Sequence, residues 1–275
     1  MKSFSAVTRS LSLIILCGIY SLATTASAQF PRHLQTIEQR AFAAGERLVY
    51  TVSYMGIRGG TLVMEVQDTP ALNGRPMYKY RTKAMSQQPV TTFFPVDDRM
   101  VSTVDAETLL PYHLSFHKKE GKKETDIDVT FDHAAGAATT IKDGQEETTP
   151  IPPSSQHAFS ALYYLRSLPS VTMGDQLTIN VHHEKKNYPV QAKVEAMEEL
   201  TGSWGRKRAL RVVVTMPYTG IWLNAGNMVV WVSDTPAHVP LKIRAKMVIG
   251  SIVADLIEGP GISQEFDDSR ARNSF

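Results

Sequence analysis

Cysteine is almost absent from this sequence, and its absence limits the chemistry of the protein. The 275 residues include one cysteine, Cys17, so the chain cannot form an intramolecular disulfide bond. Cys17 also lies in a segment that we expect to be removed from the mature protein, which would exclude a thiol nucleophile. The folded protein is therefore expected to depend on packing rather than on cross-links.

The sequence also lacks an apolar run long enough to cross a bilayer as a helix, which takes about 20 residues. The apolar stretch Leu11–Tyr20 follows the basic residues Lys2 and Arg9 and precedes the small residues Ala26–Ala28. This order is typical of a cleavable secretory signal. We therefore expect residues 1–28 to be a signal peptide that is cleaved after Ala28. The mature protein would then be periplasmic and would contain no transmembrane segment.

Neither sign of charge is in excess. The chain has 29 basic and 27 acidic residues, and removal of Lys2 and Arg9 with the signal would bring the two into balance. A neutral chain with scattered charges offers no general electrostatic attraction to nucleic acid. We therefore expect no nucleic acid among its partners.

Motifs for catalysis and for metal binding are missing as well. No Gly-x-Ser-x-Gly sequence occurs, and Gly56–Gly60 lacks the Lys-Ser/Thr pair of a phosphate-binding loop, so it is expected to form a hairpin turn or a bulge. His182 and His183 are neighbours on a predicted strand, where they would point to opposite faces and could not easily share a metal ion. We therefore expect a protein that is not an enzyme and that has no cofactor and no metal site.

What the sequence does contain is alternation of apolar and polar residues with a period of two. Clear examples are Tyr188–Glu195, Leu241–Ile249 and Tyr112–His117. The turn signals between such runs, among them Asn73-Gly74, are too short for helical crossovers, so the strands should be antiparallel. A sheet of about twelve strands tends to curl because curling protects its edges. The predicted fold is therefore mainly all-β, an antiparallel barrel or half-barrel.

One segment has helical rather than strand spacing. After Pro150–Pro153, apolar residues recur at intervals of three and four within Ala158–Leu165, and Ser154 or Ser155 could cap the helix. Its wide apolar stripe predicts that this single amphipathic helix covers a sheet face or closes one end of the barrel. Arg166 lies in the last turn, where the helix dipole favours a cation, although an ion pair or a ligand contact inside the fold would also explain it.

These patterns divide the chain into four parts. The signal peptide of residues 1–28 is followed by an irregular or short helical lead-in over residues 29–44. A single β-barrel-like domain is expected over residues 45–258. Residues 259–275 are polar, contain Gly and Pro and lack alternation, so they are expected to be a disordered tail.

Two predicted loops place large apolar side chains where a connection would normally be polar. They are Phe93-Phe94-Pro95 and Met216–Leu223. Either these side chains fold inward and plug the barrel end, or they rim a cavity for an acyl chain or another amphipathic ligand, with a cation near its anionic group. The candidate ligand-binding residues are therefore Phe93, Phe94, Tyr218, Trp222, Arg166 and Arg58.

Four stretches resemble a bacterial exported family described as domain of unknown function 3108. They are Ala44–Tyr50, Gly56-Ile57 with Gly59-Gly60, Phe159–Arg166, and Val230–Asp234 leading into His238–Ile243, and the resemblance covers nearly all of residues 44–258. It implies a periplasmic or outer-membrane-facing β-barrel-like domain, similar in fold to a lipoprotein of capsule-export operons, and it implies no activity. One departure is His238, which stands where the family often has a basic residue such as Arg.

Two functions remain open from the sequence. The first is a non-enzymatic, chaperone-like binding protein of cell-envelope biogenesis that holds a lipidic or glycan ligand or an envelope protein. The alternative is a structural accessory subunit of an envelope protein complex. A barrel integrated in the outer membrane is a third architecture, but residues 267–273 lack the apolar face of its usual closing strand.

Overall fold

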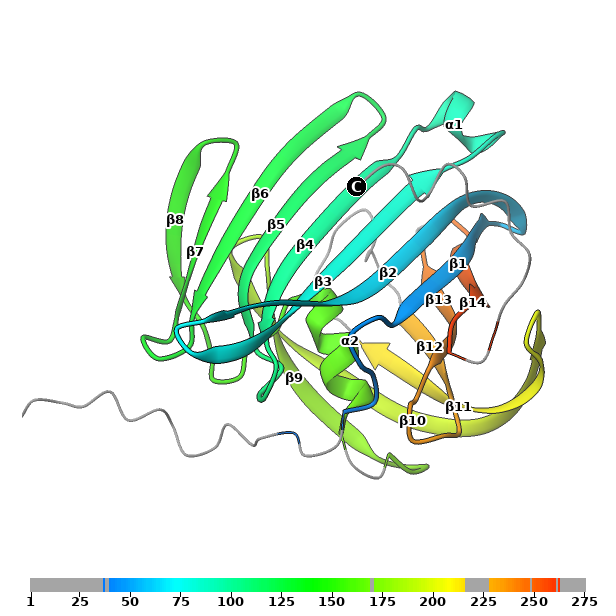
Figure 1. Ribbon diagram of the computed structural model, residues 1–275. Coiled ribbons are helices and arrows are strands. Elements are labelled where there is room, and N and C mark those ends of the chain that lie inside the picture. Colours follow the sequence, from blue (N-terminus) through cyan, green and yellow to red (C-terminus); the bar gives the residue numbers. More distant parts are fainter. Residues whose placement is uncertain are drawn as a thin grey trace, which may run out of the picture.

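The computed structural model contains one large β-sheet and two helices (Figure 1). It describes residues 37, 40–168, 171–215, 228–247, 249–260 and 262. The helices are α1 (Val90–Phe93) and α2 (Ala158–Arg166). The strands are β1 (Arg47–Tyr54), β2 (Ile57–Leu72), β3 (Arg75–Ser86), β4 (Asp97–Asp105), β5 (Pro111–Glu120), β6 (Lys123–Asp132), β7 (Ala137–Lys142), β8 (Gln145–Pro150), β9 (Gln176–His183), β10 (Lys186–Gly202), β11 (Gly205–Thr215), β12 (Met228–Ser233), β13 (Pro240–Lys246) and β14 (Ser251–Glu258).

All fourteen strands belong to one antiparallel sheet, in the order β8-β7-β6-β5-β4-β3-β2-β1-β14-β13-β12-β11-β10-β9. The first and last strands of the chain pair with each other near the middle of the sheet, and β8 and β9 form its two edges. The predicted all-β half-barrel is therefore confirmed, with fourteen strands instead of about twelve. Strand β8 is one that alternation cannot detect, because nearly all of its residues are exposed.

The connection between β8 and β9 fills part of the gap between the two sheet edges. Gln156 forms a parallel bridge with Val181 of β9. Its backbone N–H donates to Asn180 O at 2.8 Å, and its carbonyl accepts from His182 N at 2.8 Å. Near β8, the Asn187 side chain donates to Pro150 O at 2.7 Å. The edge strand β9, whose outer backbone groups would otherwise be unpaired, is thus partly covered.

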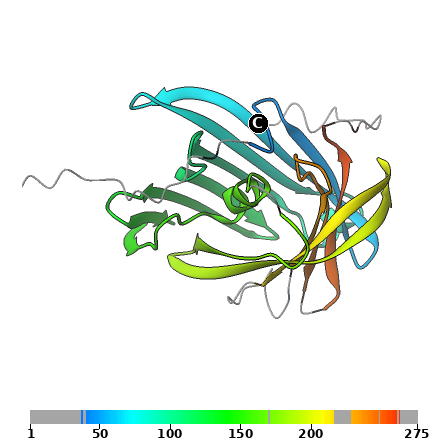
Figure 2. The ribbon, with the colours of Figure 1, turned by 90° about the horizontal axis from the view of Figure 1, so that it is seen from below.

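Helix α2 lies within the curve of the sheet (Figure 2). Its N-cap is His157, which accepts a hydrogen bond from Ser160 N, while the Ser160 hydroxyl accepts one from His157 N. The predicted cap at Ser154 or Ser155 is therefore wrong. Ser154 has a φ of +57°, and the Ser155 hydroxyl donates to Pro152 O instead. The chain between the predicted and the observed cap pairs with β9, so the helix starts later and has only nine residues.

The Gly-rich stretch after β1 forms a hairpin with a bulge, as the sequence predicts. Met55 and Gly56 occupy the turn with φ values of +50° and +83°, a conformation that glycine adopts without strain. Val52 pairs with Gly60 whereas Ser53 pairs with Arg58, which leaves Gly59 as the extra residue of the bulge. The other short helix, α1, lies between β3 and β4 and was not expected from the sequence.

The core around α2 differs between its two sides. On the side of β3, Phe42, Tyr78, Tyr80 and Tyr163 form a cluster of aromatic rings, with Tyr163 4.9 Å from Phe42 and 4.5 Å from Tyr80 between ring centroids. We call these four residues the aromatic cluster. On the side of β9 to β12, a second core cluster contains Val, Ile, Leu and Ala and no aromatic ring among its fully buried members. The helix thus separates two interiors of different composition.

Candidate functional site

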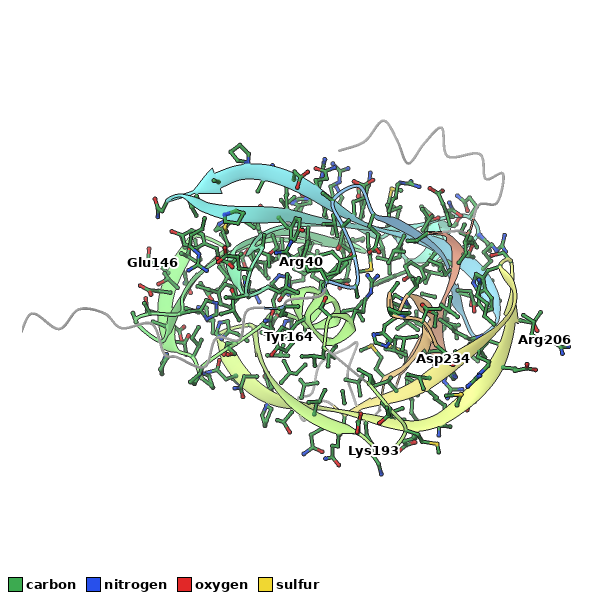
Figure 3. The ribbon with its side chains drawn as sticks, turned by 60° about the horizontal axis from the view of Figure 1, so that its bottom comes forward. Arg40, Glu146, Tyr164, Lys193, Arg206 and Asp234 are labelled. Carbon is green, nitrogen blue, oxygen red and sulfur yellow. The ribbon has the colours of Figure 1, made fainter. Side chains whose placement is uncertain are left out.

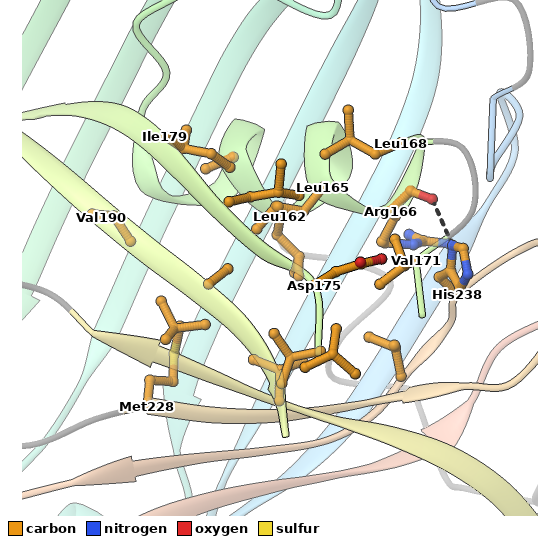
Figure 4. Close-up of a pocket in the computed structure, with 18 of the residues that line it drawn as sticks. Leu162, Leu165, Arg166, Leu168, Val171, Asp175, Ile179, Val190, Met228 and His238 are labelled. Carbon is orange, nitrogen blue, oxygen red and sulfur yellow. Dashed lines mark hydrogen bonds between the residues drawn. The ribbon is translucent and has the colours of Figure 1, made fainter. Parts of the chain in front are cut away.

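A cavity of about 410 Å³ lies between α2 and the inner face of β9 to β12 (Figure 4). Figure 4 shows Leu162, Leu165 and Leu168 on one side of this space and Val190 and Met228 on the other. Its size falls in the range of small-molecule binding sites. The cavity is lined by Ala158, Ala161, Leu162, Leu165, Arg166, Leu168, Val171, Asp175, Gln176, Leu177, Ile179, Val181, Val190, Ala192, Val194, Val212, Val214, Met228, Val230, Val232 and His238.

The periodicity of the two walls explains why the lining is apolar. On α2, Ala158, Ala161, Leu162 and Leu165 recur at the spacing of one helix face. On β10, every second residue over Val190–Val194 points into the cavity. Most wall residues are Val or Ala, whose short side chains cannot reach across to the helix. The cavity therefore results from the short side chains on the inner face of an otherwise regular half-barrel.

Of the described lining residues, four are polar: Arg166, Asp175, Gln176 and His238. Asp175 and Gln176 are exposed at the start of β9, and the neighbouring Leu177 is 38% exposed although it also lines the cavity. The cavity therefore reaches solvent at this place. A ligand could leave its polar end there while its apolar part lies inside.

Arg166, which lines the cavity, is held by protein groups. Its two terminal nitrogens donate to the two carboxylate oxygens of Glu46 at 2.7 and 2.8 Å, and the side chains of both residues are at most 5% exposed. Ala237 O accepts a further hydrogen bond from Arg166, and the guanidinium lies 5.2 Å from the ring centroid of Tyr163. This side chain is buried and paired on every side that the structure describes.

The charge of Arg166 is retained despite its burial. Burial alone would lower the pKa of Arg166, but the hydrogen bonds and the negative charge of Glu46 more than offset this and raise the pKa above its ordinary value. The ion pair explains Arg166 better than the helix dipole does, and it leaves the guanidinium with little capacity for an anionic ligand. His238 donates from Nδ1 to Arg166 O at 3.0 Å, so it orients the same helix end.

The lining is suited to binding apolar groups. Among the described residues it contains no Ser, Thr, Cys, Lys or Tyr side chain. Within the described parts of the chain, no three His, Cys, Asp or Glu residues are grouped so that they could hold a metal ion. A cavity with walls of this kind binds apolar groups because water finds few hydrogen-bond partners in it.

The six residues predicted to bind a ligand do not gather at one site. Arg166 lines the cavity, whereas Phe93, Phe94 and Arg58 do not. Phe93 is 84% exposed and Phe94 is 47% exposed, so these two side chains do not fold inward to plug the barrel. Tyr218 and Trp222 lie outside the described residues, as do the predicted signal peptide and nearly all of the predicted tail.

Two components of the site were not predicted from the sequence. One is Glu46, which precedes β1 and pairs with a residue 120 positions away. The other is the inner face of β9 to β12, whose alternation was recognised but not the shortness of its side chains. The run of short Val and Ala side chains at the inward positions Val190, Ala192, Val194, Val212 and Val214 is a signal that could have indicated a cavity.

The comparisons with known proteins concern family and fold. The model of the family described as "Protein of unknown function (DUF3108)" matches residues 49–257, which confirms the resemblance seen in the sequence. No curated protein matches the chain. A solved β-barrel-like protein of the domain of unknown function DUF1849 from Brucella abortus is similar, with a TM-score of 0.49 and 11% identity over 78% of this chain and 95% of that one.

None of the described helices has the length and apolar character needed to span a membrane.

Proposed function

This chain belongs to the DUF3108 family of proteins of unknown function, and we propose that it is an exported, non-enzymatic protein of the cell envelope whose cavity holds the apolar chain of a lipidic ligand. The observation that carries this proposal is the composition of the cavity, in which seventeen of the twenty-one lining residues that the structure describes are apolar. Transfer of an alkyl chain into such a space is favourable by about 0.8 kcal/mol for each CH₂ group that leaves water.

A lipidic ligand fits the walls better than a glycan does. Each sugar hydroxyl buried without a hydrogen-bond partner would cost about 1–3 kcal/mol, and the polar lining residues number only four. Since Arg166 is already paired with Glu46, the cavity also provides little attraction for a buried anionic head group. The head group would therefore lie near the exposed residues Asp175 and Gln176.

Export supports an envelope role. The order of basic, apolar and small residues before Gln29 is that of a secretory signal. Expression in a bacterial host followed by N-terminal sequencing of the periplasmic fraction should give a mature chain that begins at Gln29. A chain that is recovered uncut in the cytoplasm would contradict this part of the proposal.

Two adjacent positions on β10 provide the test of the cavity. Ala192 is buried and lines the cavity, whereas Lys193 is exposed and points away from the interior (Figure 3). Ala192→Trp should fill the space, and Lys193→Trp adds the same side chain to the outer face. With the delipidated mature protein and cis-parinaric acid as a fluorescent probe, we expect Ala192→Trp to weaken binding at least about tenfold, the effect of 1.4 kcal/mol.

The control variant Lys193→Trp should bind the probe as the wild type does. Ala161→Phe on the opposite wall repeats the test if Ala192→Trp does not fold. Equal affinity of the wild type and of a folded cavity-filling variant would show that the probe binds elsewhere and would contradict the proposal.

A further inference from the structure

Six of the eleven exposed large apolar side chains of the described residues lie on three neighbouring connections of the sheet. These connections join β1 to β2, β3 to β4 and β13 to β14, and the strands are adjacent in the order β4-β3-β2-β1-β14-β13. Figure 1 shows α1 and the β1–β2 connection at the same end of the sheet. We call the six residues the apolar tip: Tyr54, Met55, Ile57, Phe93, Phe94 and Ile249.

The three connections contact one another, so the tip is one surface. The Tyr54 hydroxyl donates to Ile249 O at 2.8 Å. A Cβ atom at Gly250 would overlap Met55, and one at Gly59 would overlap Val90 of α1. Both glycines thus allow the connections to approach closely. Nevertheless Phe93 remains 84% exposed, Ile249 69% and Met55 60%, so contact among the connections does not bury these side chains.

The charges around the tip are positive. Arg58 follows Ile57, and Lys246 ends β13, and both are exposed. On the other side, Gly121 N of the β5–β6 turn donates to Pro95 O at 2.8 Å, which places the exposed Lys122 and Lys123 beside Phe94. None of these four cations forms an ion pair with a described residue.

The acidic groups nearby are already engaged. Asp97 accepts two hydrogen bonds from Arg99 at 3.1 and 2.8 Å. Asp98 accepts one from Lys119 N, and Glu120 pairs with Lys118. Among the described residues, the tip therefore presents apolar side chains beside four cations that form no ion pair, while Asp98, which accepts a backbone hydrogen bond and pairs with no cation, is half-buried.

We propose that the apolar tip is a membrane-docking surface that inserts into the outer part of a bilayer containing anionic lipids. Apolar side chains on separate turns can each enter the acyl region, while cations at their base contact the negatively charged head groups. The tip and the cavity share no residue, so docking does not depend on the proposed ligand. An anionic bilayer is favoured over a protein partner because its charge is complementary to the cations around the tip. A protein surface would in addition need a shape that matches three separate turns.

Flotation of the mature protein with vesicles tests this proposal. We expect binding to vesicles of phosphatidylcholine and phosphatidylglycerol in equal parts and much weaker binding to phosphatidylcholine alone. Phe93→Ser should reduce binding about tenfold, the lower value for removing a buried Phe side chain. Lys122→Gln should reduce it about fivefold at low salt, and less at high salt because salt screens the attraction.

Matched controls alter similar side chains away from the tip. Ile141 of β7 is 42% exposed, and Ile141→Ser should leave vesicle binding unchanged, as should Lys193→Gln. Ile249→Ser provides a second tip variant should Phe93→Ser not fold. Equal binding by folded tip variants and controls would overturn the proposal. So would a wild-type protein that stays in solution with both vesicles, and the tip would then be assigned to a protein partner.

The cavity-filling variant Ala192→Trp separates this proposal from the proposed function. It should lose the cis-parinaric acid probe and keep full vesicle binding. Loss of vesicle binding in Ala192→Trp, with the fold intact, would show that the protein reaches vesicles through its cavity and would count against the tip.

Discussion

The two sides of helix α2 differ in how they fill the space that the half-barrel encloses. Toward β3, aromatic rings pack against Tyr163, and Arg166 at the end of α2 forms a buried ion pair with Glu46. Toward β9 to β12, the facing residues are Val, Ala, Ile and Leu, and a cavity remains. The same helix and the same sheet thus produce a packed interior and a hollow one, and the difference is the size of the side chains. Packing supplies stability on the first side, and the second contains the space in which we propose that a ligand binds.

Among the variants that probe the two sides of α2, the largest loss of stability is expected from breaking the Arg166–Glu46 ion pair on the packed side. Glu46→Gln leaves the Arg166 charge buried without its partner, and this should lower the free energy of unfolding by about 3–5 kcal/mol. Urea denaturation measures it. Glu199 provides the matched control, because its pair with Arg206 is exposed on both sides, so Glu199→Gln should change stability by less than about 0.5 kcal/mol.

A double variant separates charge from packing at this position. Glu46→Leu combined with Arg166→Met removes both charges together, and it should recover much of the stability that Glu46→Gln loses. If the double variant were as unstable as the single one, the cost would come from the shape of the side chains and not from an uncompensated charge.

A second effect is expected from acid, through the N-cap of α2. His157 is buried, donates from Nε2 to the Ser102 hydroxyl at 2.8 Å and accepts from Ser160 N. Burial lowers the pKa of His157 to about 3, so between pH 6.5 and pH 3 the unfolded chain binds a proton that the folded chain does not. The contribution of the neutral His157 side chain to the free energy of unfolding is fully present above pH 6.5 and is lost as the pH falls. At pH 5 the loss is about 2 kcal/mol.

Comparison with His157→Gln isolates this contribution. Burial also lowers the pKa of His133 and His182, whereas burial raises the pKa of Asp98 to about 6, which acts in the opposite sense over the same pH range. These groups are the same in both proteins. The free energy of unfolding, measured between pH 7.5 and pH 5, should therefore fall less steeply for His157→Gln. Parallel curves would contradict a buried, neutral His157.

The smallest effect is expected when the same substitution, Leu to Ala, is made on each side of α2. Leu241 is 1% exposed and belongs to the core cluster that contains the aromatic cluster, whereas Leu165 already borders the cavity. Leu241→Ala should create a new void, while Leu165→Ala enlarges an existing one and removes fewer contacts. We expect Leu241→Ala to cost about 1 kcal/mol more in thermal or urea unfolding. Equal costs would indicate that the cavity closes around Leu165 in solution.

Local patterns predicted most of the fold. Alternation such as that of Tyr188–Glu195 identifies strands, and short turns such as Asn73-Gly74 require antiparallel neighbours, so the antiparallel sheet follows from nearby residues. Its curvature was predicted from the number of strands and the need to protect the sheet edges. Strand β8 shows no alternation, because its residues are nearly all exposed. The cap of α2 was misplaced because Ser154 and Ser155 are good capping residues, but pairing with β9 uses the backbone that they would have capped.

The candidate site depends on contacts between distant parts of the chain. No residue near Arg166 in the sequence identifies Glu46 as its partner. The two side chains meet only because the fold brings the start of β1 next to the end of α2. The cavity likewise requires the inward residues of four strands and one helix to face one another. The exposed Phe93 shows the opposite case, since the sequence singled it out while its position on α1 at the apolar tip became clear only in three dimensions.

Native mass spectrometry of gently purified mature protein tests the hollow side of α2 most directly. We predict that the wild type and Lys193→Trp carry a bound mass that organic extraction removes and that belongs to a lipid. Ala192→Trp should carry none. A wild-type protein that has only the mass of its own chain, and that gains no lipid when cell-envelope lipids are added, would contradict a ligand-binding cavity.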